Sequence, residues 1–192
     1  MIRPARPDDK REAARLLLDA IHDIAYTLTG ASTEPEVLEG LQYWFVQQGN
    51  RISYENTLVK EINGQVVGLV VFYHGRAAEM LDKPIVERLR RLFQNPEITI
   101  DKEADEDEWY IDTLSVSPDY RGRGIGSELI QAVENHVKRF DQEDGKVALN
   151  VDQTNEKAHR LYRKLGFVAD KEIMINNHPY AHMVTYLIQP VR

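Results

Sequence analysis

A glycine-spaced turn between a strand-like run and a helix-like run constrains the fold of this chain more than any other feature. The turn occupies residues 121–126 and reads RGRGIG, and apolar residues at helical spacing follow it as far as Phe140. Glycine permits sharp backbone turns, and the first amides of a helix lack an intrahelical acceptor. Together with the helix dipole, this arrangement predicts a binding site for a phosphate group.

Two well-known phosphate loops do not fit the turn. It has no Gly-Lys-Ser/Thr sequence, and its glycines follow a G-x-G-x-G spacing in place of the dinucleotide G-x-G-x-x-G, with Ser127 at the last position. Taken alone, the turn is equally compatible with a tight strand-to-helix connection that binds no ligand.

Composition narrows the class of protein. The 192 residues, 42% of them hydrophobic, fit a single domain over 1–192. The formal net charge is −7, and residues 101–108 alone carry six acids and one lysine, so we expect no nucleic-acid partner. The chain contains no cysteine, which excludes disulfides, thiolate metal ligands and a thiol nucleophile.

The distribution of charge along the chain also bears on its location. The amino-terminal stretch is charged where a secretory signal needs an apolar region, and no window approaches the length of apolar sequence that a membrane span requires. We therefore expect a cytoplasmic protein with no membrane partner.

The order of elements predicts an α/β domain with a mixed sheet and helices on both faces. Helical patterns cover residues 7–24, 34–49, 84–93, 125–140 and 154–165. Strand-like runs cover residues 57–62, 66–73, 109–118, 147–151, 167–175 and 183–188. Asn63-Gly64, between the first two runs, is a strong signal for a tight hairpin.

Two segments together identify a resemblance. Residues 114–126, LSVSPDYRGRGIG, and residues 155–167, NEKAHRLYRKLGF, resemble the acyl-CoA signature and the following helix of the GNAT superfamily of N-acetyltransferases. The resemblance covers about residues 109–168 and implies the GNAT acyltransferase fold, with a mostly antiparallel sheet of about six or seven strands. It also implies acetyl-CoA as co-substrate, an amine acceptor as second partner and a possible homodimer, although no residue specifies an interface.

The resemblance also implies roles for individual residues. Strand backbone at Leu114, Ser115 and Val116 would pair with the pantetheine arm of the cofactor, and Tyr162 would protonate the leaving thiolate. Asn155 would hydrogen-bond the cofactor arm. The pyrophosphate would be wrapped by the turn and the first residues of the helix, which are Arg121, Gly122, Arg123, Gly124, Ile125, Gly126 and Ser127.

Each of these roles has a purely structural alternative. Asn155 is also suited to be a helix N-cap, and Tyr162 lies on an apolar helical stripe where it would serve as a core aromatic. Arg121 and Arg123 would then be exposed charges.

The general base is the missing part of the pattern. Attack on a thioester needs a neutral amine, yet a lysine-like amine has a pKa of about 10.4. The family often places a Glu on the strand after the glycine-turn helix, where this sequence has Asn150, which accepts no proton at neutral pH. Asp112 is the nearest candidate because alternation puts it on the same face as Leu114 and Val116, with Glu108 as second choice. Asp112 could equally bind a cationic substrate or a neighbouring backbone group.

Two further groups of residues stand outside the motifs. His178, Tyr180 and His182 would share one face of a regular strand, and we expect them to line an acceptor pocket and not to bind a metal. The acidic run 101–108 is expected to be a solvated loop, or alternatively to attract cationic acceptors. In proteins that resemble this one, the acceptor pocket is built by the least motif-like segments, here the early helices, residues 76–108 and the final turn.

These observations predict an acetyl-CoA-dependent N-acetyltransferase that acts on a primary amine of a small molecule, peptide or protein, by direct attack in a ternary complex. A non-catalytic acyl-CoA-binding sensor or regulatory module is the alternative, and Asn150 favours it. A scaffold whose glycine turn is purely structural is a third class.

Overall fold

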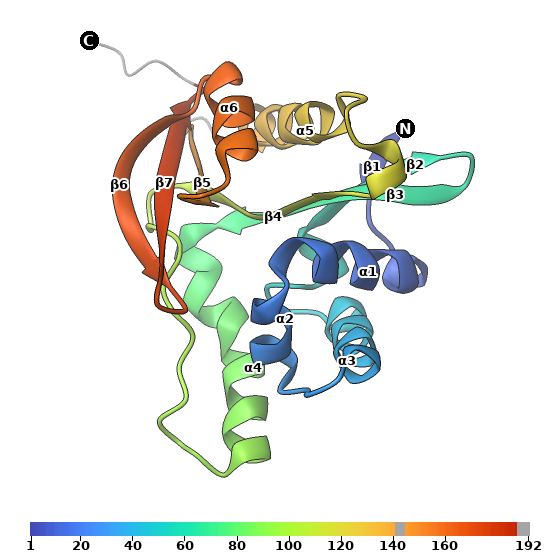
Figure 1. The fold of residues 1–192 in the computed structure, drawn as a ribbon, viewed down its shortest axis with the longest axis vertical. Helices are drawn as coiled ribbons and strands as arrows, with labels where there is room; N and C mark the ends of the chain where they lie inside the picture. Colours follow the sequence, from blue (N-terminus) through green and yellow to red (C-terminus); the bar gives the residue numbers. More distant parts are fainter. Residues whose placement is uncertain (141–144, 188–192) are drawn as a thin grey trace.

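Seven strands form one sheet in the order β1-β2-β3-β4-β5-β7-β6 (Figure 1). The structure is a computed structural model that describes residues 1–140 and 145–187. The strands are β1 (Ile2–Pro4), β2 (Thr57–Ile62), β3 (Gln65–His74), β4 (Trp109–Val116), β5 (Lys146–Asp152), β6 (Val168–Ile175) and β7 (His178–Tyr186). Every neighbouring pair is antiparallel except β4 and β5, which run parallel. This is the mostly antiparallel sheet of the GNAT fold that the resemblance implied.

Helices cover both faces of the sheet, as predicted. They are α1 (Lys10–Ile21), α2 (Asp23–Thr29), α3 (Glu34–Val46), α4 (Ala78–Phe93), α5 (Ile125–Phe140) and α6 (Glu156–Lys164). Helices α1 to α4 lie on one side of the sheet, and α5 and α6 lie on the other (Figure 1). Among the described helices, none is both long and apolar enough to cross a membrane.

Each face has its own core, because successive residues of a strand point to opposite sides. On β3, Leu69 and Val71 pack with α1, α3 and α4, whereas Val70 and Phe72 pack with α5. The second core continues onto β5 and β7, and residues of α6 contact it from the edge. The sheet therefore separates the α5 face from the face that carries the early helices.

Several predicted elements agree with the structure. The hairpin of β2 and β3 turns at Asn63 and Gly64, with φ of 52° and 79°, as the dipeptide predicted. Helix α3 begins at Glu34 behind the N-cap Thr33, whose capping box with Glu36 fixes its start. The run predicted over 183–188 is the end of β7, which begins at His178; Ile188 lies outside the described residues.

Other elements differ from the prediction. The apolar stripe of the first helix continues to Ile24, but the backbone breaks at His22, where φ is 39°, and α2 begins at Asp23. Helix α4 begins at Ala78 and contains Pro84, which was expected at its first position. Strand β1 was not predicted, since its three residues carry too little pattern and are ordered by pairing with β2.

Candidate functional site

The two parallel strands at the centre of the sheet separate shortly after they meet. β4 and β5 are in register at three residue pairs, of which Ile111 with Leu149 is the last, while β4 continues to Val116 and β5 to Asp152. β3 stays paired with β4 as far as Val116. Over residues 112–116, the side of β4 that faces β5 therefore has no strand partner within 1–140 and 145–187, which leaves a gap that another extended chain can enter.

The glycine turn stands at the end of this gap. Gly122 and Gly124 have φ of 77° and 81°, a region that strains any other residue. A Cβ on either would meet no atom within 4 Å, so backbone conformation and not space requires glycine there. The first backbone bond of α5 runs from the Glu128 amide to the Gly124 carbonyl, at 3.0 Å.

The backbone amides of residues 122–127 consequently have no acceptor among the described residues. Six clustered donors at the positive end of a 16-residue helix are suited to binding an anion. The phosphate site predicted from the sequence at Gly122, Arg123, Gly124, Ile125, Gly126 and Ser127 stays a prediction.

The two arginines of the turn fold back onto it. Arg121 Nε donates to the Val116 carbonyl at 2.9 Å, and an Arg123 Nη donates to the Asp119 carbonyl at 3.0 Å. Both residues are exposed, and the Arg123 guanidinium lies over the ring of Tyr120, with its central carbon 5.0 Å from the ring centroid. They brace the turn and keep positive charge beside it.

Leu114 and Val116 lie at the gap, on the α5 face of β4, and Ser115 between them is buried. A Cβ placed on Gly126 would point towards the same region, 3.8 Å from a Leu114 methyl and 3.9 Å from one of Leu161 on α6. The start of α5, the gap beside β4 and the first turns of α6 therefore adjoin one another.

Asn155 and Tyr162 belong to α6. Asn155 is its N-cap, with Oδ1 accepting from the Ala158 amide at 3.1 Å, which leaves its Nδ2 group without an acceptor among the described residues. The Tyr162 ring packs on Phe167 at 6.0 Å between centroids, and burial raises the pKa of Tyr162 to about 12. Each residue therefore makes the structural contact that was the alternative to its predicted role. Neither contact uses the Asn155 Nδ2 group or the Tyr162 hydroxyl, which the predicted roles require.

Asp112 lies on the opposite face from the one predicted. The register of β3 and β4 shifts between Val71 and Phe72, so Asp112 is an extra residue in a β-bulge. Regular alternation fails at a bulge, and Asp112 turns towards Tyr73, whose hydroxyl donates to Oδ2 at 2.7 Å, and away from Leu114 and Val116. Its carboxylate also accepts from Arg51 Nε at 2.9 Å.

Arg51 is the buried cation of this face. Its guanidinium contacts Asp112 and Glu103 at 2.6 and 2.9 Å and Asp82 at 3.3 Å. Burial opposes its charge, but Asp112 and Glu103 outweigh that effect and raise the pKa of Arg51. Burial also raises the pKa of Asp82, to about 6. The stretch that contains Arg51 matched no motif, and no local signal identified it.

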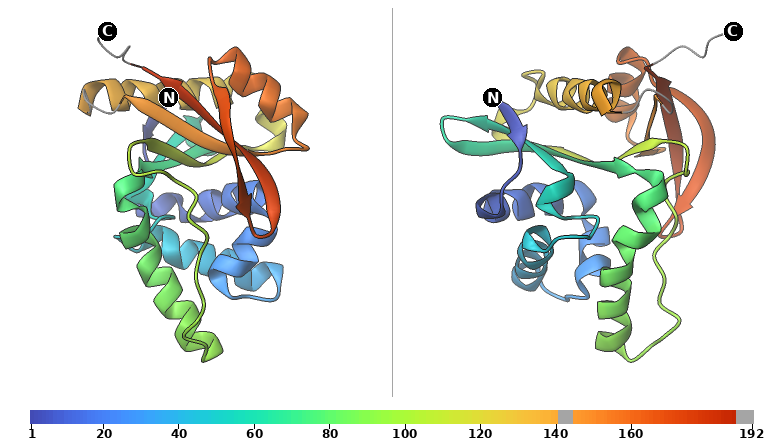
Figure 2. Two further views of the ribbon diagram at one scale, coloured as in Figure 1. Left: turned by 90° about the vertical axis from the view of Figure 1, so that its left-hand side faces the viewer. Right: turned by 180° about the vertical axis from the view of Figure 1, so that it is seen from behind.

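A groove opens from this cluster to the surface. It has a volume of about 820 Å³ and runs between α4 and the connection that follows it, with Arg51, Tyr73 and Glu103 in its lining. The connection folds back along α4 before it enters β4 (Figure 2). The groove thus reaches the sheet on the face opposite to the glycine turn, beside the point where β4 and β5 separate.

The acidic run 101–108 is not the solvated loop that was expected. A backbone carbonyl of the run, that of Asp105, lies so close to Gly75 that a Cβ there would be 1.7 Å from its oxygen. Lys171 Nζ lies 2.6 Å from Asp105, and Lys146 Nζ lies 3.1 Å from Glu108. Glu108 is fully buried, which argues against the second choice of general base.

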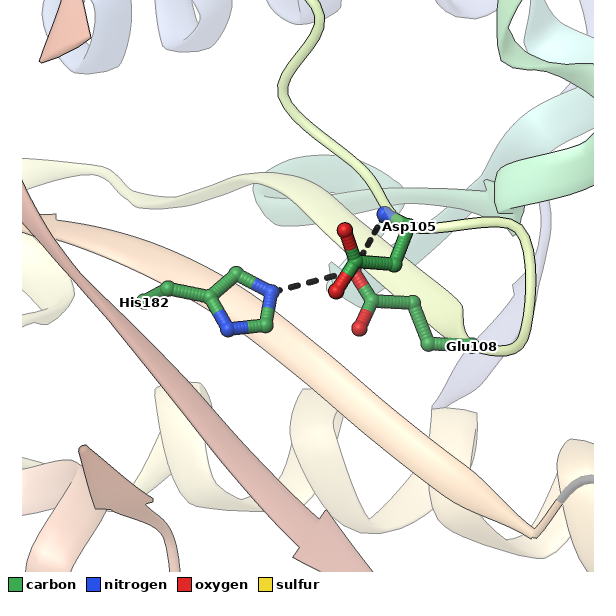
Figure 3. Close-up of side chains that lie close together, drawn as sticks. All are labelled: Asp105, Glu108 and His182. Carbon is green, nitrogen blue, oxygen red and sulfur yellow. Dashed lines mark hydrogen bonds and ion pairs between the residues drawn. The ribbon is translucent and has the colours of Figure 1, made fainter. Parts of the chain in front are cut away.

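His182 lies beside Glu108 (Figure 3) and both are buried, whereas His178 is exposed. Its Nε2 lies 3.0 Å from Glu108 Oε1 and its Nδ1 lies 2.6 Å from Asp170 Oδ1. Burial lowers the pKa of His182, but the two carboxylates outweigh it and raise the pKa above its ordinary value. A ring with a carboxylate at each nitrogen is best satisfied as the doubly protonated imidazolium.

Asp105, Glu108 and His182 offer possible metal ligands within 4.8 Å of one another (Figure 3). Lys146 and Lys171 already neutralise the two carboxylates, and both nitrogens of His182 have carboxylate partners. A cation would have to displace these groups, so the residues fit a metal poorly and we propose none.

Solved structures with the same architecture include an N-acetyltransferase from Staphylococcus aureus Mu50. It superposes with a TM-score of 0.80 at 29% identity, covering 96% of this chain and 100% of that one. Another solved structure, described as an acetyltransferase, superposes with a TM-score of 0.79 at 31% identity, covering 97% of this chain and 99% of that one.

Curated relatives match a shorter stretch. N-alpha-acetyltransferase 30 of Xenopus laevis and that of Homo sapiens are each 38% identical over 64 residues, which is 33% of this chain. The match spans 23% of the frog protein and 17% of the human one, so this chain shares less than a quarter of either.

A family model matches most of the chain, over residues 18–167, and the matched stretch includes β4, β5, the glycine turn and α6. Its description is the acetyltransferase (GNAT) family. With the shared architecture of the solved acetyltransferases, this match shows that the chain belongs to the acetyltransferase (GNAT) family.

Proposed function

We propose that this protein transfers the acetyl group of acetyl-CoA to a primary amine. The observation that carries the proposal is the amide cluster of residues 122–127 at the end of the gap between β4 and β5. The amides suit the diphosphate of coenzyme A, and the gap is suited to an extended pantetheine arm beside Leu114, Ser115 and Val116. The Nδ2 group of Asn155 is available to donate to the same arm.

The chemistry proceeds by direct attack in a ternary complex. The acceptor reaches the thioester from the groove, on the face opposite to α5, and its nitrogen adds to the thioester carbonyl carbon. Tyr162 donates its hydroxyl proton to the departing sulfur, and its raised pKa keeps that proton in place until thiolate forms. Asp112 as general base stays a prediction, but its carboxylate is already held by Arg51 and Tyr73.

The acceptor class remains a primary amine of a small molecule, peptide or protein. The relatives named N-alpha-acetyltransferase 30 place the free amino group of a peptide among the first acceptors to test. The groove of about 820 Å³ has room for several residues of an extended chain.

A non-catalytic acyl-CoA-binding module is the second candidate, and Asn150 favours it because an amide accepts no proton at neutral pH. Both candidates require binding. At acetyl-CoA concentrations 100 times the dissociation constant, ligand binding adds about 2.7 kcal/mol, which raises the melting temperature by roughly 5–10 °C. Adenosine at the same concentration is the control and gives a much smaller shift, because it lacks the diphosphate.

The experiment that separates the candidates measures thiol release from acetyl-CoA with a panel of short peptides, diamines and polyamines. Turnover with at least one amine, with the acetyl group found on its nitrogen by mass spectrometry, supports the enzyme. Binding without turnover across the panel supports the module, and no thermal shift contradicts both.

A further inference from the structure

Glu103 carries a carboxylate into the groove beside the place where β4 and β5 separate. Its side chain is 13% exposed and lies in the lining of the groove. Oε1 accepts from an Arg51 Nη at 2.9 Å, and Oε2 accepts from the Tyr110 hydroxyl at 2.8 Å. Each oxygen has a single strong partner, so each keeps a lone pair for a further donor.

Asn150 is the first residue of β5 beyond its register with β4, and it points at the same place. Its Nδ2 donates to the Tyr110 hydroxyl at 2.9 Å and to the Glu103 carbonyl at 3.0 Å. A backbone carbonyl only accepts, so the orientation of the amide is fixed. Its Oδ1 is then buried without a donor among the described residues, which is costly unless a ligand supplies an N–H group.

Asp112 is the competing carboxylate, and its contacts leave it less available. Its Oδ2 accepts from two nitrogens of Arg51 and from the Tyr73 hydroxyl, and its Oδ1 accepts from Thr113 at 2.9 Å. A carboxylate that already accepts from four donors has little room for a further partner. Asp112 is therefore better suited to fixing Arg51 than to accepting a proton from the acceptor.

We propose that Glu103 is the general base that deprotonates the acceptor amine, and that Asn150 positions this amine by accepting one of its N–H groups at Oδ1. The inference rests on the proposed acetyl transfer. Glu103 thereby fills the role for which the sequence offered no residue on β5.

The protons balance in two steps. The acceptor ammonium gives its first proton to a Glu103 oxygen, which later releases it to solvent, and the neutral nitrogen forms a bond to the thioester carbon. As the carbon–sulfur bond breaks, Tyr162 protonates the sulfur. The nitrogen loses its second proton, which returns through solvent to the Tyr162 oxygen, and the products are the acetylated amine, free coenzyme A and one proton.

The charges around Glu103 suit a base. Burial raises the pKa of Glu103 above the ordinary carboxyl value, and Arg51 opposes this rise, so the carboxylate is a stronger base than an exposed one. The ionisable groups that face it come from β3, β4, β7, α4 and the segment after α3, and they are Tyr73, Tyr110, Asp112, Tyr180, Asp82 and Arg51.

The test uses the full chain and the amine that gives the fastest thiol release in the panel. For Glu103→Gln we expect kcat/KM to fall about 100-fold or more at pH 7, with the affinity for acetyl-CoA within twofold of the parent. Glu97→Gln, on the exposed part of the same connection, is the matched control and keeps the parent rate.

Chemical rescue separates a base from a structural residue. In Glu103→Ala, added formate can occupy the space of the lost carboxylate. We expect the rate of this variant to increase with the formate concentration, by at least tenfold. Formate adds nothing to Asn150→Ala, whose rate falls through a higher KM for the amine.

Four outcomes would overturn the inference. Glu103→Gln keeping kcat/KM within threefold of the parent removes Glu103 from the chemistry. Loss of acetyl-CoA binding in that variant, or a rate that formate leaves unchanged in Glu103→Ala, makes Glu103 structural. A parent protein that turns over no amine in the panel overturns the proposed enzyme function together with the inference. Activity of the parent therefore distinguishes failure of the Glu103 inference alone from failure of the proposed function.

Discussion

Tyr162 packs against the core on the α5 face of the sheet without using its hydroxyl in the fold. Its ring packs on Phe167, and its hydroxyl has no partner among the described residues. A hydroxyl with a raised pKa and no bond of its own, on a half-buried tyrosine, is suited to giving a proton to a leaving group, because the fold does not compete for that proton.

Replacing Tyr162 with Phe tests this role. We expect kcat to fall by about 100-fold or more, because the thiolate leaves unprotonated. The ring contact is kept, so the free energy of unfolding changes by no more than about 0.5 kcal/mol. Steady-state kinetics and urea unfolding measure the two effects, and Tyr186→Phe on the exposed end of β7 is the control. A Phe variant with unchanged kcat would show that Tyr162 is only a core aromatic.

The start of α5 is the element on which the proposed binding of acetyl-CoA depends. Gly126 has no positive φ and a Cβ there would make ordinary contacts at 3.8 Å or more, so nothing in the protein alone requires glycine at this position. Its Cβ would nevertheless occupy the region between Leu114 and Leu161, where the proposed cofactor arm leaves the amide cluster.

Gly126→Ala should therefore separate folding from binding. We expect a melting temperature equal to or above that of the parent, because alanine favours a helix by roughly 0.5–1 kcal/mol over glycine. Calorimetry should show the affinity for acetyl-CoA weakened at least tenfold. Gln131→Ala, on the exposed face of α5, leaves the affinity unchanged. A variant that binds acetyl-CoA as tightly as the parent would place the cofactor away from this helix start.

The local patterns predicted most elements, and the pairings between distant elements could not be predicted. The glycine turn, α5, β5 and α6 carry their signals within a few residues. The break at His22 interrupts an apolar stripe that continues on both sides of it, and the bulge at Asp112 depends on register with β3. The bulge reversed the expected face of Asp112, which is why alternation gave the wrong side.

The same limit applies to the site. The turn with its unpaired amides was predictable because these donors are consecutive in sequence, whereas the polar residues on the other face come from segments that lie far apart in the sequence. Arg51, Glu103 and Asn150 are brought together by the sheet and by the fold-back of the connection after α4. A residue such as Glu103, within an acidic run, has no local feature that distinguishes it from its neighbours.

At the scale of the whole molecule, His182 ties β7 to the acidic segment through a charge. Its pKa is raised in the folded protein, so its contribution to stability is fully present below its unfolded value of about 6.5 and is lost as the pH rises through the folded value. His182→Gln cannot take this charge. We expect the difference in free energy of unfolding between the parent and this variant to be largest below about pH 6 and to shrink as the pH increases.

Urea unfolding of both proteins from pH 5.5 to 9 measures that difference. Comparing the two proteins at each pH cancels the titration of every other group they share. His178→Gln, at an exposed position on the same strand, shows no such dependence. A difference that is constant over the range would mean that His182 is neutral in the folded protein.

The parallel pairing of β4 with β5 is short, so other contacts between the two halves of the sheet matter. The halves of the sheet are joined by three residue pairs between β4 and β5, and the segment before β4 contacts both halves, from Gly75 directly after β3 to Lys146 on β5 and Lys171 on β6. That segment is a second connection between the halves and also forms one wall of the groove. A designer who wished to admit bulkier acceptors should therefore alter this segment and leave the strands unchanged.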